Sequence, residues 1–208
     1  MTDRPIIFSA PMVRALLDGR KTQTRRVLGN SGPGRGRSNI FSAQIGWSDS
    51  YVLDPGNANW RERDTPYAPG DRLWVREAFS YESLDVDRNG FMPPWYWADG
   101  NPESGDFTRP KPSIHMPRWA SRLTLLVTDV RVQRLQEISR GDAMEEGCPF
   151  ANMADGPNPR DWYRGIWNSI HGPGAWDASP WVCAISFDML RGNIDDAEAV
   201  AARKETGK

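Results

Sequence analysis

The residues best suited to chemistry form one short basic segment, Gly19-Arg20-Lys21-Thr22-Gln23-Thr24-Arg25-Arg26. It carries four cations and two hydroxyl groups and no acid. If the segment bends into a turn, the Lys21 amine lies near the Thr24 hydroxyl, which is the pairing that a Ser/Thr nucleophile needs when lysine is its base. The flanking arginines could bind a phosphate or carboxylate through forked hydrogen bonds. The alternative is a solvated basic loop in which Thr24 only caps the turn.

A short predicted helix leads into this segment. Ser9 suits the N-cap position and Pro11 the first turn. Gly19 is a typical residue just past a helix C-terminus. The apolar residues Met12, Ala15 and Leu16 fall on one helical face, which we expect to be buried. The sequence therefore places residues 21–26 on a surface just beyond the end of this helix.

Alternating and Val-rich runs predict the strands. A Pro-Gly-Asp turn at 69–71 leads into a strand that ends at Glu77, and the run 123–135 gives the longest strand signal. Short strands are expected at 5–9 and 180–187, and one aromatic strand at 95–97. Residues 41–53 suggest a hairpin, and the Gly-rich stretch 29–39 a loop.

Two further helices are predicted in the second half of the chain. The first covers residues 136–147, in which Ser139 can act as the N-cap and Asp142, three residues later, occupies a capping-box position. Glu145 and Glu146 lie in its last turn, where carboxylates oppose the helix dipole, so one of them is a candidate site residue. Residues 159–170 form the second helix, with a core face predicted for Trp162, Ile166, Trp167 and Ile170.

Composition limits the classes of function. The 208 residues are 38% hydrophobic with a mean hydropathy of -0.64, and no apolar run is long enough to span a bilayer. The net charge of -1 argues against a uniformly basic nucleic-acid coat. Two cysteines are too few for a disulfide framework, which favours a cytoplasmic location. Two histidines and two cysteines without ligand spacing predict no metal, and we expect no cofactor.

The order of these features resembles the ASCH family. Three pieces carry the likeness: RPIIFSAPMVRALLDGRKTQTRR at 4–26, GDRLWVREAF at 70–79 and PSIHMPRWASRL at 112–123. They look like ASCH proteins of bacteriophage and prophage genomes. The resemblance implies an α+β fold, a PUA-like mixed β-barrel with flanking helices. The domain would span residues 1–188, with insertions at about 29–66 and 82–112, and residues 189–208 would form a charged, flexible tail.

The resemblance also implies a function. One branch of this superfamily removes acyl groups from the exocyclic amine of cytidine, with N4-acetylcytidine as the best known substrate. Matched by position, its catalytic residues are Lys21, Thr24 and Glu146, with Glu145 an open alternative for the carboxylate. The candidate substrate-binding residues are Arg20, Arg25, Arg26, Trp74, Glu77, His115 and Trp119.

The expected partner is a modified nucleoside or RNA, and we expect no association with a membrane. The rival hypothesis is a non-catalytic RNA-binding module with a basic cleft and aromatic stacking, because PUA-like barrels often bind RNA without chemistry. A ribonuclease ranks last. The state of Lys21 discriminates between the first two hypotheses. A catalytic lysine should be recessed with a shifted pKa, and an RNA-binding lysine should be exposed.

Overall fold

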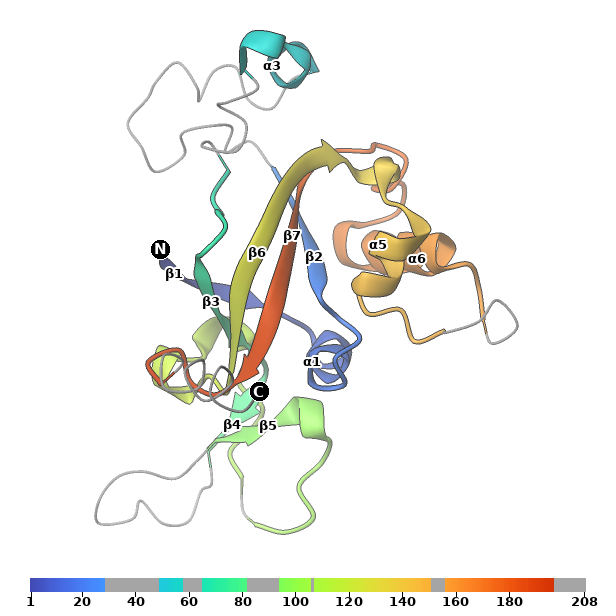
Figure 1. The fold of residues 1–208 in the computed structure, drawn as a ribbon. Coiled ribbons are helices and arrows are strands. Elements are labelled where there is room, and N and C mark those ends of the chain that lie inside the picture. The colour runs from blue at the N-terminus through green and yellow to red at the C-terminus, as the bar shows by residue number, and fades with distance from the viewer. Residues whose placement is uncertain (29–48, 58–64, 82–93, 106, 151–155, 197–208) are drawn as a thin grey trace, which may run out of the picture. The chain divides into compact units, whose positions relative to one another are not determined.

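The computed structural model describes residues 1–28, 49–57, 65–81, 94–105, 107–150 and 156–196, and it is an α+β protein (Figure 1). Five strands form one mixed sheet in the order β1-β3-β6-β7-β2, and β4 and β5 form a separate two-stranded sheet. The larger sheet ends at β1 and β2, and the described strands do not close it into a barrel. The strands are β1 Asp3–Ile7, β2 Gln23–Val27, β3 Arg72–Arg76, β4 Phe79–Ser80, β5 Trp95–Tyr96, β6 Leu123–Arg134 and β7 Trp181–Arg191.

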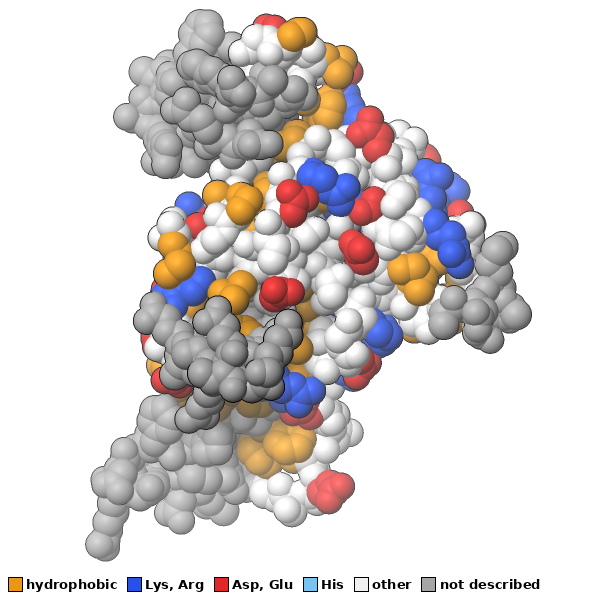
Figure 2. Space-filling view, viewed as in Figure 1, with side chains coloured by type: hydrophobic (Ala, Val, Ile, Leu, Met, Phe, Trp, Pro, Cys, Tyr) orange, Lys and Arg blue, Asp and Glu red, His pale blue; other side chains and the backbone are white. Residues whose placement is uncertain are grey.

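The chain divides into two compact units. The first unit comprises residues 1–19, 71–126 and 188–208, and the second comprises residues 20–70 and 127–187. Within the described residues no helix is long and apolar enough to cross a membrane. Lys and Arg side chains lie interspersed with Asp and Glu on the face in view, so this face carries no continuous basic coat (Figure 2).

The first unit confirms the predicted helix before the basic segment. Helix α1 (Ala10–Leu17) starts after Ser9 at the N-cap, with Pro11 in its first turn. Gly19 follows the C-cap with a φ of 73°, a left-handed conformation that glycine adopts without steric cost. The buried face is formed by Val13, Ala15 and Leu16, while Met12 is only half-buried.

The predicted strand at 72–76 is also confirmed in this unit. Strand β3 pairs with β1 in parallel and with the first residues of β6 in antiparallel fashion. Its alternating burial places Leu73 and Val75 in the core. The aromatic strand predicted at 95–97 is β5, which ends one residue earlier because Trp97 begins the 3₁₀-helix η2 (Trp97–Asp99).

In the second unit, the basic segment does not form the predicted turn. Residues 23–27 are strand β2, which pairs antiparallel with β7 from Gln23↔Ser186 to Val27↔Val182. The backbone of β2 forms a regular hydrogen-bonded ladder with β7, about 160 residues further along the chain. The local run of charged residues does not indicate this pairing. The predictions of a turn and of a solvated loop are therefore both wrong.

The predicted capping box of the second unit is confirmed. Ser139 Oγ accepts a hydrogen bond from the Asp142 backbone N–H at 3.0 Å, and Asp142 Oδ2 accepts one from the Ser139 backbone N–H at 3.0 Å. Residues 135–137 form the 3₁₀-helix η5 (Leu135–Glu137), and the α-helix itself is the shorter α5 (Arg140–Glu145), with Glu146 as its C-cap.

Helix α6 (Pro159–His171) lies beside α5 and covers the core of this unit (Figure 1). Its predicted core face is partly wrong. The buried side chains are Pro159, Tyr163 and Trp167, whereas Ile170 is 65% exposed. The buried stripe follows the i, i+4 spacing of one helical face. Ile170, seven residues after Tyr163, points in nearly the same direction, but it lies in the last turn of α6 and stays exposed.

The remaining element predictions have mixed outcomes. Strand β6 confirms the long strand, and β7 extends four residues beyond the predicted end at 187. Ile194, three residues after β7, is fully buried. Residues 49–53 of the predicted hairpin form helix α3 (Asp49–Leu53), followed by the 3₁₀-helix η1 (Pro55–Asn57). Residues 41–48, the Gly-rich stretch 29–39 and the end of the tail lie outside the described residues.

Candidate functional site

Lys21 is a buried lysine at the start of β2. Its backbone forms an isolated antiparallel bridge with Glu146, and its side chain is 2% exposed. The amine Nζ donates hydrogen bonds to Gln23 O at 2.9 Å, to Glu146 O at 3.0 Å and to Glu146 Oε2 at 2.7 Å. These three acceptors match the three donors of an ammonium group. The segment after α1 therefore holds its lysine in a buried ion pair with the end of α5.

The carboxylate of Glu146 joins Lys21 to Arg25. Its Oε1 accepts a hydrogen bond from Arg25 Nη1 at 3.1 Å, while Oε2 accepts the bond from Lys21. Arg25 Nη1 also donates to Gln23 Oε1 at 2.6 Å, and Arg25 Nη2 lies 3.4 Å from Asp142 Oδ2. The cluster contains two cations, Lys21 and Arg25, and two carboxylates, Asp142 and Glu146. These four groups are balanced in charge, as a buried group of ions requires. The exposed Arg131 also binds Asp142, with Nη2 2.8 Å from Oδ1.

The structure distinguishes the two adjacent glutamates. Glu146 contacts the lysine and is 2% exposed, whereas Glu145 Oε2 accepts a hydrogen bond from Gln23 Nε2 at 3.0 Å. Gln23 Nε2 also donates to Ser186 Oγ at 3.2 Å. Of the two carboxylates that the sequence left open, Glu146 is the partner of Lys21.

Burial perturbs the ionisation of this cluster. Removal from water lowers the pKa of Lys21, and the nearby charges of Arg26 and Arg25 act in the same direction, while Glu146 opposes them. Burial alone would raise the pKa of Asp142, but hydrogen bonds from Arg131 and Ser139 lower it overall. The lysine amine is therefore easier to deprotonate than a lysine in water.

Thr24 lies on the other face of β2. Successive side chains of a strand point to opposite faces, so Gln23 and Arg25 share the face of the ion cluster and Thr24 faces away from it. Thr24 is 2% exposed and pairs across the ladder with the buried Ile185. The amine bonds of Lys21 described above end on Gln23 and Glu146 rather than on the Thr24 hydroxyl.

Arg25 has donors that are not satisfied by the described residues. Its side chain is fully buried, yet Nε and Nη2 have no hydrogen-bond partner there. The guanidinium carbon lies 5.9 Å from the centre of the Tyr163 ring, a cation–π arrangement. A buried donor without an acceptor typically lowers the stability of the fold by about 1–3 kcal/mol. Arg25 can therefore donate hydrogen bonds to a further acceptor.

Two predicted cations of the second unit lie nearer its surface. Arg20 is exposed, and its Nη1 donates a hydrogen bond to Gly147 O at 2.8 Å. This bond links the segment before β2 to the residue that follows the C-cap of α5. Arg26 is half-buried and lies close enough to His171 to lower the pKa of that histidine, after burial as the larger cause.

Glu77, a residue of the first unit, forms a second buried ion cluster. It is 1% exposed, and its two oxygens accept hydrogen bonds from Arg122 Nε and Nη2 at 2.9 and 3.0 Å. The other edge of the same guanidinium binds Asp99, and its centre lies 4.0 Å from the Tyr96 ring. Because Arg122 is held on both edges and one face, this cluster is a rigid structural junction.

The other predicted residues of the first unit are more accessible. Trp74 is half-buried under the guanidinium of Arg76, whose carbon lies 5.2 Å from the ring centre. His115 is exposed in the 3₁₀-helix η3 (Ser113–His115). Trp119 is 45% exposed in η4 (Arg118–Ala120) and stacks on Tyr81 with ring centres 6.0 Å apart.

The sequence missed three members of the Lys21 cluster. Gln23 and Asp142 were not assigned to the site, and Tyr163 was not singled out at all. The Glu146 charge, after burial, raises the pKa of Tyr163 well above its usual value, so the phenol stays protonated beside the carboxylate. The signal that could have found Gln23 is period-2 alternation, which places it with Arg25 once residues 23–27 are recognised as a strand.

A search of the described residues finds no group of three or more His, Cys, Asp or Glu side chains that could hold a metal ion. Comparisons with protein-family models, with curated proteins and with solved structures found no match for this chain.

Proposed function

We propose that this protein is an ASCH protein with a PUA-like barrel, and that it hydrolyses the N4-acyl amide of a modified cytidine such as N4-acetylcytidine. One observation carries the proposal. Lys21 and Glu146, which the family resemblance assigns to catalysis, form a buried ion pair at 2.7 Å although they lie 125 residues apart. Buried ionisable pairs with perturbed pKa values are typical of active sites.

In the proposed reaction, Glu146 Oε2 takes a proton from Lys21 and leaves a neutral amine. The burial that lowers the pKa of Lys21 favours this transfer. The amine then leaves Gln23 O, and the Lys21 side chain moves to the opposite face of β2, where the amine accepts the proton of the Thr24 hydroxyl. Because Lys21, Thr24 and Glu146 are each 2% exposed, neighbouring side chains must move to admit the substrate.

The covalent steps follow from that deprotonation. Thr24 Oγ forms a bond to the amide carbon, and the carbon–N4 bond breaks as the Lys21 ammonium returns a proton to N4, which releases cytidine. Water then hydrolyses the Thr24 ester, which releases acetate and restores the hydroxyl.

The test is cytidine release from N4-acetylcytidine by the purified protein. We expect Thr24→Val and Glu146→Gln to abolish release, because the first removes the nucleophile and the second removes the proton acceptor. Thr22→Ala is the matched control for the hydroxyl, since Thr22 is exposed and its recorded bonds are made by the backbone. Turnover that survives Thr24→Val in a folded protein would refute the threonine mechanism.

The alternative proposal is a non-catalytic module that binds RNA or a modified nucleoside. It is favoured by the exposed Trp119 stacked on Tyr81, with the Lys111 amine 4.6 Å from the Tyr81 ring centre. Exposed aromatic rings beside cations stack on unpaired bases. Binding of single-stranded RNA that Trp119→Ala weakens, together with no cytidine release, would favour this alternative. Ribonuclease activity remains the third candidate and has no structural feature in its favour.

A further inference from the structure

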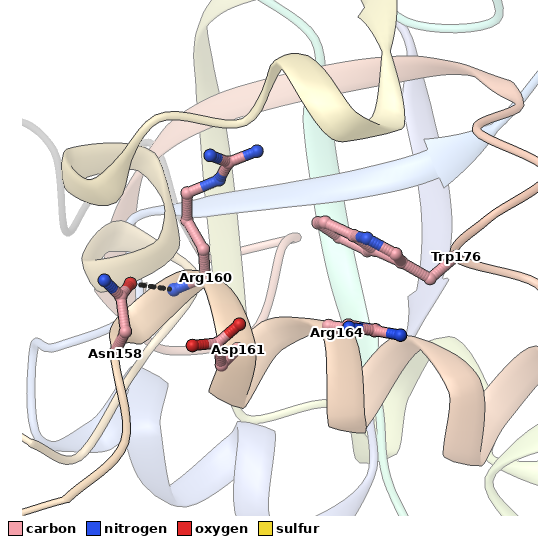
Figure 3. Close-up of a pocket in the computed structure, with 5 residues that line it drawn as sticks. All are labelled: Asn158, Arg160, Asp161, Arg164 and Trp176. Atoms are coloured by element: carbon pink, nitrogen blue, oxygen red, sulfur yellow. Dashed lines mark hydrogen bonds between the residues drawn. The ribbon is translucent and has the colours of Figure 1, made fainter.

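A pocket of about 230 Å³ lies in the second unit, beside the start of α6, and takes no part in the proposed hydrolysis. Its lining residues are Asn158, Arg160, Asp161, Arg164 and Trp176 (Figure 3). Pockets that bury a whole small-molecule ligand usually measure about 300–1,000 Å³. This pocket therefore suits one chemical group of a larger ligand.

Two of the four polar lining residues are arginines. Arg160 and Arg164 are four residues apart on α6, so both side chains leave the same side of the helix. Arg160 Nη2 donates to Gln136 O at 2.8 Å, which fixes this side chain by one bond and leaves a five-donor guanidinium with capacity for more. Arg164 Nη2 lies 3.9 Å from Asp177 Oδ1, too far for a hydrogen bond.

The helix N-terminus itself is not the basis of the site. The Arg160 backbone N–H already donates to the Asn158 side chain at 3.0 Å, as the dashed line in Figure 3 marks. The pocket differs from an ordinary helix start because two guanidinium groups and an indole border the same hollow. In the close-up, Trp176 lies above Arg164, and Asp161 lies below Arg160 (Figure 3).

We propose that this pocket binds the phosphoryl group of a larger anionic ligand. Guanidinium groups bind phosphate oxygens through paired, charge-assisted hydrogen bonds. With two arginines and one aspartate the lining carries a net charge of +1, which attracts an anion. Asp161 is an acceptor, so it favours a ligand that also presents an O–H or N–H donor, as a protonated phosphate or a nucleotide does. The indole of Trp176 supplies the apolar side of the pocket.

The ring of Trp176 gives this site its own spectroscopic readout. It packs against Tyr163 with ring centres 6.3 Å apart, and its backbone N–H donates to Asn168 Oδ1 at 2.9 Å, so its position is fixed. A ligand in the pocket should shift the indole N–H resonance of Trp176 in ¹H–¹⁵N spectra. The Trp176→Phe variant identifies that resonance among the ten tryptophans.

The experiment titrates the full-length protein with inorganic phosphate at low ionic strength, by calorimetry and by the Trp176 resonance. The Arg160→Gln/Arg164→Gln variant should weaken phosphate binding at least about tenfold, because each charged hydrogen bond typically contributes about 1.5–3 kcal/mol. Asp161→Asn should tighten it by about twofold to fivefold, because it removes a repelling charge. Acetate should bind more weakly than phosphate, because it has fewer oxygens to share between two guanidinium groups.

Arg4→Gln is the charge-matched control. Arg4 is an exposed arginine of β1 and is not one of the residues that line the pocket, so it is suited to report the effect of net charge alone. The proposal is overturned if Arg4→Gln weakens phosphate binding as much as the double variant, or if the double variant binds like the wild type. Arg164→Gln alone, with only the 3.9 Å ion pair to lose, keeps the test valid if Arg160→Gln impairs folding.

Cytidine 5′-monophosphate tests the size argument. It should bind more tightly than inorganic phosphate if the pocket takes one group of a larger ligand, and weaker binding would refute that argument. These measurements need no turnover, so their result is independent of the proposed hydrolysis.

Discussion

Replacement of Lys21 by methionine tests the reasoning behind the buried ion cluster most directly. Methionine keeps an unbranched chain of similar length but removes the positive charge. The cluster then holds Arg25 against two carboxylates, Asp142 and Glu146, and has a net charge of -1 in a site where Lys21 and Glu146 are each 2% exposed. Removal of one partner of a buried ion pair typically costs about 3–5 kcal/mol.

The expected effect is large enough to measure. For a protein of this size, each kcal/mol shifts the Tm by about 2–4 °C, so Lys21→Met should lower the Tm by about 6–20 °C. The double variant Lys21→Met/Glu146→Gln restores charge balance, because Arg25 then faces Asp142 alone. We therefore expect it to be more stable than the sum of the two single variants predicts, with a coupling of about 2–3 kcal/mol.

Urea unfolding of the four proteins in this cycle, at one pH, gives the coupling free energy. Arg164→Gln is the control for an exposed ion pair. Because the Arg164 and Asp177 side chains are 51% and 68% exposed, its loss should cost less than about 1 kcal/mol. The reasoning fails if Lys21→Met costs as little as this control, since that result would mean that water reaches the lysine in the folded protein.

Two further predictions concern other ionic contacts. Because the folded protein holds the pKa of Asp142 low, its ionised form contributes stability above the unfolded pKa of about 3.9, and this contribution is lost as the pH falls toward the lower folded value. Asp142→Asn should therefore flatten the acid side of the stability–pH curve measured by urea unfolding, whereas Asp129→Asn, at a 56% exposed side chain, should not. Arg122→Met should destabilise the protein by about 3 kcal/mol or more, because it leaves the buried Glu77 without its partner; thermal unfolding should show a smaller loss for Glu77→Gln, and equal losses would contradict the ion-pair explanation.

Local signals in the sequence predicted a good part of the fold. The N-cap position of Ser9, the glycine at 19 and the capping box of Ser139 with Asp142 are each decided within a few residues, and all three are confirmed. The alternation in β3 and the Val-rich run of β6 were also sufficient, because burial of one strand face leaves a period-2 pattern in the sequence. The family resemblance named Lys21 and Glu146 without any knowledge of their distance.

The errors arose where distant partners decide the conformation. Residues 23–27 look like a basic turn until β7 is placed beside them, and a strand at the sheet edge cannot be recognised from its own charges. Ile170 fits the helical stripe of Tyr163 and Trp167, yet it is exposed in the last turn of α6, because a helical pattern does not encode how far along the helix the packing partners extend. The open sheet also differs from the expected barrel, since closure depends on strand pairings that no local pattern encodes.

The sequence by itself determined the N-cap residues of α1 and α5 and the strands in which buried and exposed side chains alternate. It also gave a lysine, a threonine and a pair of glutamates as candidate site residues. Only the tertiary structure showed that Glu146 and not Glu145 contacts Lys21, brought Gln23 and Arg25 into the same cluster, and put Thr24 on the opposite face of β2. The physical reason is that capping and alternation act over two to four residues. The partner of a buried charge is set instead by the register between a strand and a helix end 125 residues apart.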